Sequence, residues 1–229
     1  MNSAHDFQSI LKLEFNDISL LERAFIHRSY LNEHPKLGLE HNERLEFLGD
    51  AVLELVVTDF LYRKYDNPEG DLTNWRSALV KTESLAAVAE TLDVMSYMRL
   101  SRGEAKGNDR SRMLISANAT EAIIGAIYLD LGYDTAKDFI TKRIIARLPE
   151  ILETGTWVDP KSKFQEMAQE RDGQTPQYKV LEESGPDHDK VFVVGVYVGK
   201  QLLGQGKGSS KQTAQQMAAE SALKAYVKA

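Results

Sequence analysis

Cysteine is absent from this chain of 229 residues, which excludes a disulfide framework and any metal site built on thiolates. Long hydrophobic runs are also scarce: the uncharged apolar stretch at 191–199 is far too short to span a bilayer. Residues 1–15 lack a basic segment followed by a long apolar run, so we expect no secretory signal peptide. We therefore expect a cytoplasmic protein with no membrane partner.

Positive charge is in short supply. The net charge is −6, which taken alone argues against a general nucleic-acid binder. The charge is unevenly distributed, because ten Lys and Arg face nine Asp and Glu from residue 156 onward, while the first 155 residues carry −7. With 42% hydrophobic and 27% charged residues the composition is that of a globular protein with one or two domains.

The first two thirds of the chain are predicted to be all-helical. Apolar residues recur three and four positions apart up to about residue 150, with breaks at 34–35, 67–70 and 101–111. Pro149 is expected to end the last of these helices. We place the first domain at 4–152 and a linker at 153–158.

The remainder, 159–229, changes its period and is predicted to be a small α+β domain. A helix is expected at 160–171, three strands at 178–184, 190–198 and 200–207 with a tight turn at Gly199, and a final Ala-rich helix. Ser209 or Ser210 is available as the N-cap of that last helix. The predicted order is α-β-β-β-α.

The segment HNERLEFLGDAVLEL at 41–55 gathers four carboxylates on one helical stripe. At 100° per residue they fall within an arc of about 80°, opposite several apolar residues of the same segment. We therefore expect the acids to face directly away from the core. The residues on the two sides are Glu43, Glu46, Asp50 and Glu54 against Leu45, Leu48, Val52 and Leu55.

A solvated helix surface remains one interpretation of this acidic stripe. Two details favour a functional one: the acids repel one another without interleaved Lys or Arg, and Phe47 lies among them and needs a partner. Clustered oxygen ligands without Cys or His suit a hard cation, Mg²⁺ or Mn²⁺, as in a phosphodiester-cleaving site. Asn118 and Glu121, three residues apart on another helix, are a second candidate source of oxygen ligands.

The stretch NERLEFLGDAVLEL resembles the signature of the ribonuclease III family. The family's other segments follow in order as FIHRSYLNEH at 25–34, PEGDLTNWRSALVKTESLA at 68–86 and TEAIIGAIYLD at 120–130. The C-terminal part is similar to the family's double-stranded-RNA-binding domain. The resemblance implies an all-α ribonuclease III endonuclease domain followed by a small α+β domain that binds double-stranded RNA.

The implied activity is an endoribonuclease that needs Mg²⁺, for which Mn²⁺ can substitute, and no small-molecule cofactor. It would hydrolyse both strands of double-stranded RNA as a homodimer and leave 5′-phosphate and 3′-hydroxyl ends with short 3′ overhangs. Processing of ribosomal-RNA precursors and messenger RNA is the expected role.

The resemblance also implies roles for individual residues. Asp50 and Glu121 are expected to be catalytic, while Phe47 is expected to enter a pocket of the partner subunit. The expected metal ligands are Glu46, Asp50, Asn118 and Glu121, with Glu43 and Glu69 acting on substrate or in the outer shell. Position 118 is often Asp in the family, so a catalytically weakened protein that only binds double-stranded RNA is the alternative.

The resemblance places the expected RNA contacts in three parts of the second domain: the first helix, the loop between the first two strands and the start of the last helix. Lys207 and Lys211 flank backbone N–H groups at a helix start, which favours a phosphate there. Gln212 and Gln215 stand where many members have basic residues, so fewer counterions are released and binding is expected to be weaker. The complete expected set is Gln165, Glu166, His188, Lys207, Ser209, Ser210 and Lys211.

Other noticeable residues are interpreted structurally. A lone His among apolar neighbours, His27, is expected to be structural, and Trp75 and Tyr128 are expected in the core. Glu54 is interpreted as a solvent-exposed helix residue and Arg76 as a helix-surface or interface residue.

Overall fold

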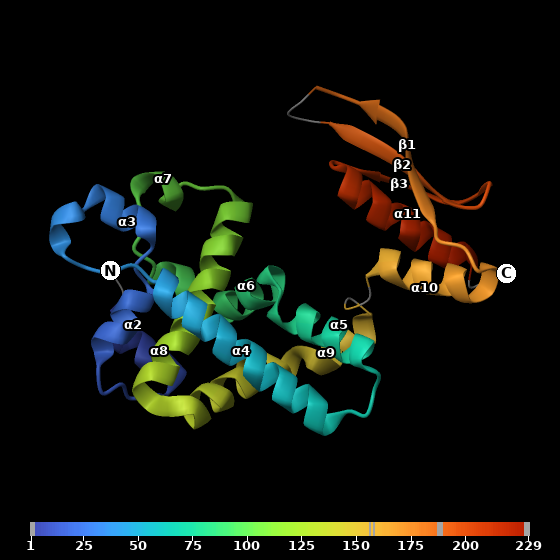
Figure 1. Cartoon of the computed structure of the whole chain (residues 1–229). Coiled ribbons are helices and arrows are strands. Elements are labelled where there is room, and N and C mark those ends of the chain that lie inside the picture. The colour runs from blue at the N-terminus through green and yellow to red at the C-terminus, as the bar shows by residue number, and fades with distance from the viewer. Residues whose placement is uncertain (1–2, 156, 158, 187–189, 227–229) are drawn as a thin grey trace. The chain divides into compact units, whose positions relative to one another are not determined.

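A computed structural model describes residues 3–155, 157, 159–186 and 190–226 of the chain. The chain divides into two compact units, Met1–Trp157 and Val158–Ala229, and each has its own hydrophobic core (Figure 1). This confirms the predicted fold class, a helical domain followed by a small α+β domain.

The described part of the first unit is built of helices and 3₁₀ turns. The α-helices are α1 (Ala4–Leu11), α2 (Ile18–Ala24), α3 (Arg28–Glu33), α4 (Glu43–Lys64), α5 (Glu69–Val80), α6 (Thr82–Thr91), α7 (Arg102–Ala105), α8 (Asp109–Arg143) and α9 (Leu148–Thr154). The 3₁₀ turns are η1 (Pro35–Leu37), η2 (Val94–Ser96) and η3 (Ile145–Arg147).

Helices α4 and α8 pack against each other in the centre of this unit (Figure 1). The N-terminal end of α4 is tied down by buried Asn42, whose backbone N–H and side-chain amide donate to the carbonyls of Ile26 and Ala24. Helix α8 is capped by the Asn108 side chain, and Gly132 with φ 81° bends its axis in the last third. These two helices carry all the predicted site residues of the first unit except Glu69.

Among the described residues, one helical stretch, Asp109–Thr154, is long and apolar enough to cross a membrane by length and composition alone. The mean hydropathy of its most apolar window is 1.3. Of its most apolar window, 61% is buried inside the protein. The apolar side chains already have partners in the core, as expected for the central helix of a folded domain.

Several predicted boundaries differ from the structure. Pro149 lies in the first turn of α9 instead of ending a helix, since the first turn needs no N–H from it. Helix α9 reaches Thr154, and the ring of Trp157 packs edge-on against Trp75 at 5.8 Å, so the start of the predicted linker belongs to the first unit. The polar break at 101–111 holds the short helix α7 and the start of α8.

The second unit has the predicted order α-β-β-β-α. Its elements are α10 (Pro160–Asp172), β1 (Gln177–Ser184), β2 (Val191–Val198), β3 (Gln201–Gly208) and α11 (Lys211–Tyr226). The strands form an antiparallel sheet in the order β1-β2-β3, and Gly199 makes the turn between β2 and β3 with φ 59°. Ser210 caps α11, because its Oγ accepts from the backbone N–H of Thr213 at 3.1 Å.

Small residues let α11 lie directly on the sheet. A Cβ added to Gly204 or Gly206 would overlap the backbone of Ala218. Four alanines of α11, together with Phe164 of α10 and the valines of β2, fill the space between the helices and one sheet face. The start of α11 is thereby held at a definite place beside the end of β3.

Candidate active site

The carboxylates of α4 lie along the edge where this helix meets α8. Gly49 and Leu53 are buried on that face, Glu46 next to them is partly buried and Asp50 is exposed. Leu55, which the helical projection assigned to the core, has an exposed fraction of 58%. The prediction that the acids face directly away from the core is therefore wrong, because the buried face of α4 is rotated toward them.

Two glycines bring the second helix of the site into contact with the first. A Cβ at Gly49 would overlap the backbone carbonyl of Glu121, and a Cβ at Gly125 would overlap that of Leu45. Because neither residue has a Cβ, the backbones of α4 and α8 touch at this crossing. Glu121 is thereby held next to Asp50, the residue that follows Gly49.

Asn118 lies one turn before Glu121 on α8 and contacts the other helix. Its side-chain amide hydrogen-bonds the carboxylate of Glu46. An ionised carboxylate only accepts hydrogen bonds, so the amide nitrogen is the donor and the amide oxygen stays available for another partner.

The pKa values of two carboxyl groups show how closely the acids are gathered. Burial raises the pKa of Glu121 to about 8, and the charges of Asp50 and Glu46 add to this effect. The pKa of Glu46 is also raised, first by burial and then by Glu43, while the hydrogen bond from Asn118 opposes the shift. The arrangement concentrates negative charge in a partly buried place, where a cation is strongly favoured.

The donor set fits a hard divalent cation held by few protein ligands. Within the described ranges, no group of three or more His, Cys, Asp or Glu side chains is placed so that it could hold a metal ion by itself. Mg²⁺ commonly takes only one or two carboxylates and completes its octahedron with water and substrate phosphate. Three carboxylates and one amide oxygen, with no sulfur or imidazole, match that preference.

Glu43 lies at the edge of the cluster, in the first turn of α4. Its carboxylate oxygens are 3.7 Å from Nη1 of Arg28 and 3.7 Å from Nδ1 of His41. Since Glu43 also raises the pKa of Glu46, it is near enough to interact with that member of the cluster. Sequence reasoning did not single out Arg28 and His41, which place a guanidinium group and an imidazole ring beside Glu43.

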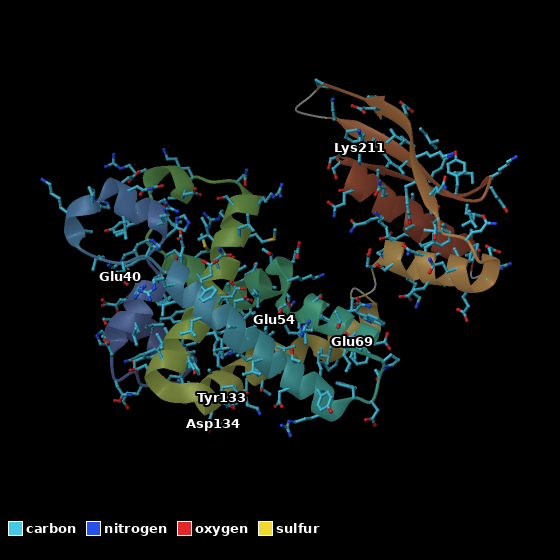
Figure 2. All side chains as sticks on the ribbon, viewed as in Figure 1. Glu40, Glu54, Glu69, Tyr133, Asp134 and Lys211 are labelled. Atoms are coloured by element: carbon cyan, nitrogen blue, oxygen red, sulfur yellow. The ribbon has the colours of Figure 1, made fainter. Side chains whose placement is uncertain are left out.

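Glu69 is not brought to this cluster within one chain. It begins α5 and lines a cavity of about 250 Å³ formed with the C-terminal half of α4, including Leu61 and Tyr62. Figure 2 shows Glu40, just before α4, and Glu69 toward opposite ends of that helix. Thr58, another lining residue, lies eight residues beyond Asp50, which is about 12 Å along a helix.

The residue expected to enter a partner pocket, Phe47, is 80% exposed. Leu55 and Tyr62 of the same helix are 58% and 78% exposed. All three lie within an arc of about 80° on one face of α4. The helix thus presents an apolar stripe to the outside next to the carboxylates.

The structural interpretation of His27 is confirmed, and Glu54 is partly exposed on α4 but has an ion-pair partner that the sequence does not indicate. His27 caps α3, since its Nδ1 accepts from the backbone N–H of Ser29. Glu54 is not free in solvent: its Oε2 pairs with Nε of Arg76 at 3.1 Å and so ties α4 to α5. Trp75 and Tyr128 lie in or against the core as expected.

The expected RNA-contacting residues of the second unit are at its surface. Gln165 and Glu166 are exposed on α10, while Lys207 and Ser209 are exposed at the end of β3. Ser210 and Lys211 are exposed where α11 begins, with Lys211 labelled in Figure 2. His188 lies outside the described residues.

Gly49 and Gly125 are the site-building residues that sequence reasoning missed. A glycine inside a helix costs about 1 kcal/mol relative to alanine, so its presence in two apolar helical segments is itself a signal. That signal indicates a close approach of two helices but does not say which helices meet.

Comparisons with known proteins agree with this geometry. Residues 17–148 match the family model for ribonuclease-III-like domains, and residues 160–226 match the double-stranded RNA binding motif. A Ribonuclease 3 of Carboxydothermus hydrogenoformans is 45% identical, covering 94% of this chain and 92% of its own, and one of Streptococcus pneumoniae is 44% identical, covering 95% and 96%.

Among solved structures, the nuclease domain of ribonuclease III from Campylobacter jejuni matches with a TM-score of 0.57 and 38% identity, covering 65% of this chain and 98% of its own. A second structure of that domain, described as flexible in a region involved in dimer formation, matches with a TM-score of 0.56 and 39% identity over 62% of this chain and 96% of its own.

The nuclease fold, the acidic crossing of α4 and α8 and the RNA-binding motif define a nuclease that acts on structured RNA. The chain belongs to the ribonuclease III family. It is an endoribonuclease for double-stranded RNA, from a family of generally metal-dependent nucleases.

Proposed function

We propose that two copies of this chain form a homodimer that cuts both strands of an RNA duplex with Mg²⁺, for which Mn²⁺ can substitute. The observation that carries the proposal is the partly buried cluster of Glu46, Asp50, Asn118 and Glu121 across two touching helices. The products would be 5′-phosphate and 3′-hydroxyl ends with short 3′ overhangs. Ribosomal-RNA precursors and messenger RNA in the cytoplasm are the proposed substrates.

The bound metal would lower the pKa of a water molecule and stabilise charge on the phosphate. The residues Asp50 and Glu121 would hold it, with Glu46 and the free amide oxygen of Asn118 completing the protein's share of the ligands. Hydrolysis adds the water oxygen to phosphorus and breaks the bond to the 3′ oxygen, which leaves with a proton.

Asn118 is compatible with activity. The amide nitrogen would donate to Glu46, while the amide oxygen keeps one of the two oxygen ligands that an Asp would offer. What is lost is one negative charge, so we expect weaker metal affinity than with Asp but not an inactive site. This argues against the alternative of a protein that only binds RNA.

The apolar stripe of α4 supports the dimer. Leu55 lies eight residues after Phe47 and seven before Tyr62, so a twofold axis near Leu55 sets two α4 helices antiparallel and Phe47 opposite the partner's Tyr62. Tyr62 lines the cavity of about 250 Å³ between α4 and α5, which can receive a phenyl ring. Phe47 on one subunit and this cavity on the other would then form the same contact twice.

The same symmetry gives Glu69 a place in the site. Glu69 lines the cavity that would receive the partner's Phe47, and Phe47 directly follows Glu46. Each subunit would therefore bring its Glu69 near the carboxylate cluster of the other. The outer-shell role of Glu69 becomes possible only in the dimer.

The test is cleavage of an end-labelled RNA duplex of a few tens of base pairs, with Mg²⁺ or with EDTA. We expect metal-dependent cutting by the parent chain, none by Glu121→Ala, and faster cutting at low Mg²⁺ by Asn118→Asp. An intact duplex with the parent chain, together with cutting by Asn118→Asp, would instead establish the RNA-binding alternative.

A further inference from the structure

A carboxylate in β1 holds a lysine that is expected to bind RNA. The Nζ atom of Lys211 is 4.0 Å from Oε2 of Glu183 and 5.5 Å from the centroid of the Phe192 ring. The other oxygen of Glu183, Oε1, is 3.1 Å from Nζ of Lys190. The negative charge of Glu183 thus lies between Lys190, which directly precedes β2, and Lys211, the first residue of α11.

The sheet register fixes this arrangement. Glu183 of β1 pairs with Phe192 of β2, and Phe192 pairs in turn with Gly208 of β3. Gly208 immediately precedes the turn into α11, so the three strands place Glu183, Phe192 and Lys211 in one row. The contact therefore depends on backbone pairing and not only on the rotamers of long side chains.

The lysines near the start of α11 differ in whether their side chains already have partners within the protein. Lys161 donates from Nζ to Oε1 of Gln215 at 2.8 Å. Among the residues that the structure describes, Lys207 has no ion pair or hydrogen bond of its side chain. With 60% of its side chain exposed, Lys211 can reach a phosphate only in competition with Glu183.

We propose that Glu183 sets the affinity of this protein for double-stranded RNA by competing with phosphate for Lys211. In the free protein the lysine faces the carboxylate, and when RNA binds it exchanges the carboxylate for a phosphate oxygen. The inference rests on the proposed role of Lys211 in holding the duplex. Because this weakens substrate and transition state alike, it raises KM without raising the barrier of the chemical step.

The experiment measures binding of the full chain to a labelled RNA duplex by fluorescence anisotropy, in EDTA and at several salt concentrations. We expect Glu183→Gln to bind about two- to fivefold more tightly, the range for an exposed ion pair. The slope of log K against log salt should steepen by up to about one, since Lys211 gains a full phosphate contact. In Mg²⁺ the variant should show a lower KM with kcat not increased.

Glu182→Gln is the matched control, because it removes the same charge from the neighbouring residue of β1, which is exposed and forms no ion pair with another described residue. A double-mutant cycle with Lys211→Gln tests the route of the effect. The gain from Glu183→Gln should disappear when Lys211 is already neutral.

The inference is overturned if Glu183→Gln binds like the parent, if Glu182→Gln gains as much, or if the gain persists beside Lys211→Gln. A parent chain that binds no RNA duplex at any salt would overturn the proposed function as well. The two failures are distinguishable because only the second one is seen without any substitution.

Discussion

The carboxylate site and the RNA-binding surface differ in how firmly the fold holds their side chains. The carboxylates come from two helices whose backbones touch at Gly49 and Gly125, and burial raises the pKa of Glu121 to about 8. The expected RNA contacts are exposed side chains at helix starts and strand ends, such as Lys207 and Lys211. Chemistry on a phosphate needs fixed geometry, whereas duplex RNA is recognised by shape through many weaker contacts.

Removing a central carboxylate should have the largest effect. Asp50→Asn keeps the shape of the side chain but removes a charge that we expect to act on the transition state, so cleavage should fall by about 10²–10³-fold or more. Single-turnover cleavage of a labelled duplex measures this loss. RNA affinity in EDTA should stay within about twofold, and an equal loss of binding would contradict the separation of the two regions.

Phe47→Ala tests the contact between subunits. A buried aromatic anchor contributes about 2 kcal/mol or more, and a twofold interface contains it twice, so dimer dissociation should increase by about 10²–10³-fold. Sedimentation at low concentration measures it. Leu129→Ala, which removes another exposed apolar side chain, is the control. The fold of the monomer should be unaffected, since Phe47 is 80% exposed.

Gly125→Val tests the close crossing. The isopropyl group of Val has no room, because its Cβ alone would overlap the backbone carbonyl of Leu45, so we expect a loss of about 1–3 kcal/mol in the free energy of unfolding and a clear loss of cleavage. Gly70→Ala is the control, because nothing lies within 4 Å of a Cβ there. Unchanged stability and cleavage in Gly125→Val, measured by denaturation and end-labelled cleavage, would contradict the role of this crossing.

Stability without metal should depend on pH through Glu121. Its pKa is about 8 in the folded protein against an ordinary 4.5, so the folded state retains a proton that the unfolded state releases between these values. The contribution of Glu121 to the free energy of unfolding is therefore fully present below about pH 4.5 and is lost as the pH rises to about 8. We expect a loss of about 1–2 kcal/mol after allowance for solvent screening.

Denaturation in EDTA at pH 5 and pH 8 measures this dependence. Glu121→Gln has no proton to lose at this position and should be less sensitive to pH than the parent. Adding Mg²⁺ at pH 8 should restore stability to the parent by binding only the folded state. Equal pH dependence of the two chains would contradict the charge cluster.

Lys207→Gln should have the smallest effect. Loss of one phosphate contact should weaken RNA binding a few-fold, equally for all duplex sequences, and reduce the salt slope by about one. Anisotropy titrations at two or more salt concentrations measure both quantities. A sequence-dependent loss would show that Lys207 reads more than the phosphate backbone.

The predictions that succeeded depend on local patterns. Period and composition identified α10, the three strands and the cap at Ser210, because capping and alternation are decided by residues a few positions apart. The resemblance of 42–55 and of three further segments, in the order of the ribonuclease III family, identifies the family, which the comparisons confirm. The roles of the individual site residues stay predictions.

The predictions that failed depended on which surfaces meet. A helical wheel gives the stripe of acids on α4 but not the face that α8 covers, so it predicts Leu55 to be buried and Glu46 to be exposed. The pairing of Glu54 with Arg76 joins two helices 22 residues apart in the sequence, which no local pattern reveals.

The sequence alone determined the two domains, the family and the residue types available for catalysis, since these follow from short-range periodicity and from the order of the family's segments. Only the tertiary structure decided that Glu121 lies beside Asp50, that Glu69 lies at the other end of α4 and that Glu183 faces Lys211. Each of these depends on contacts between distant parts of the chain, whose geometry is set by packing at two glycines or by strand register.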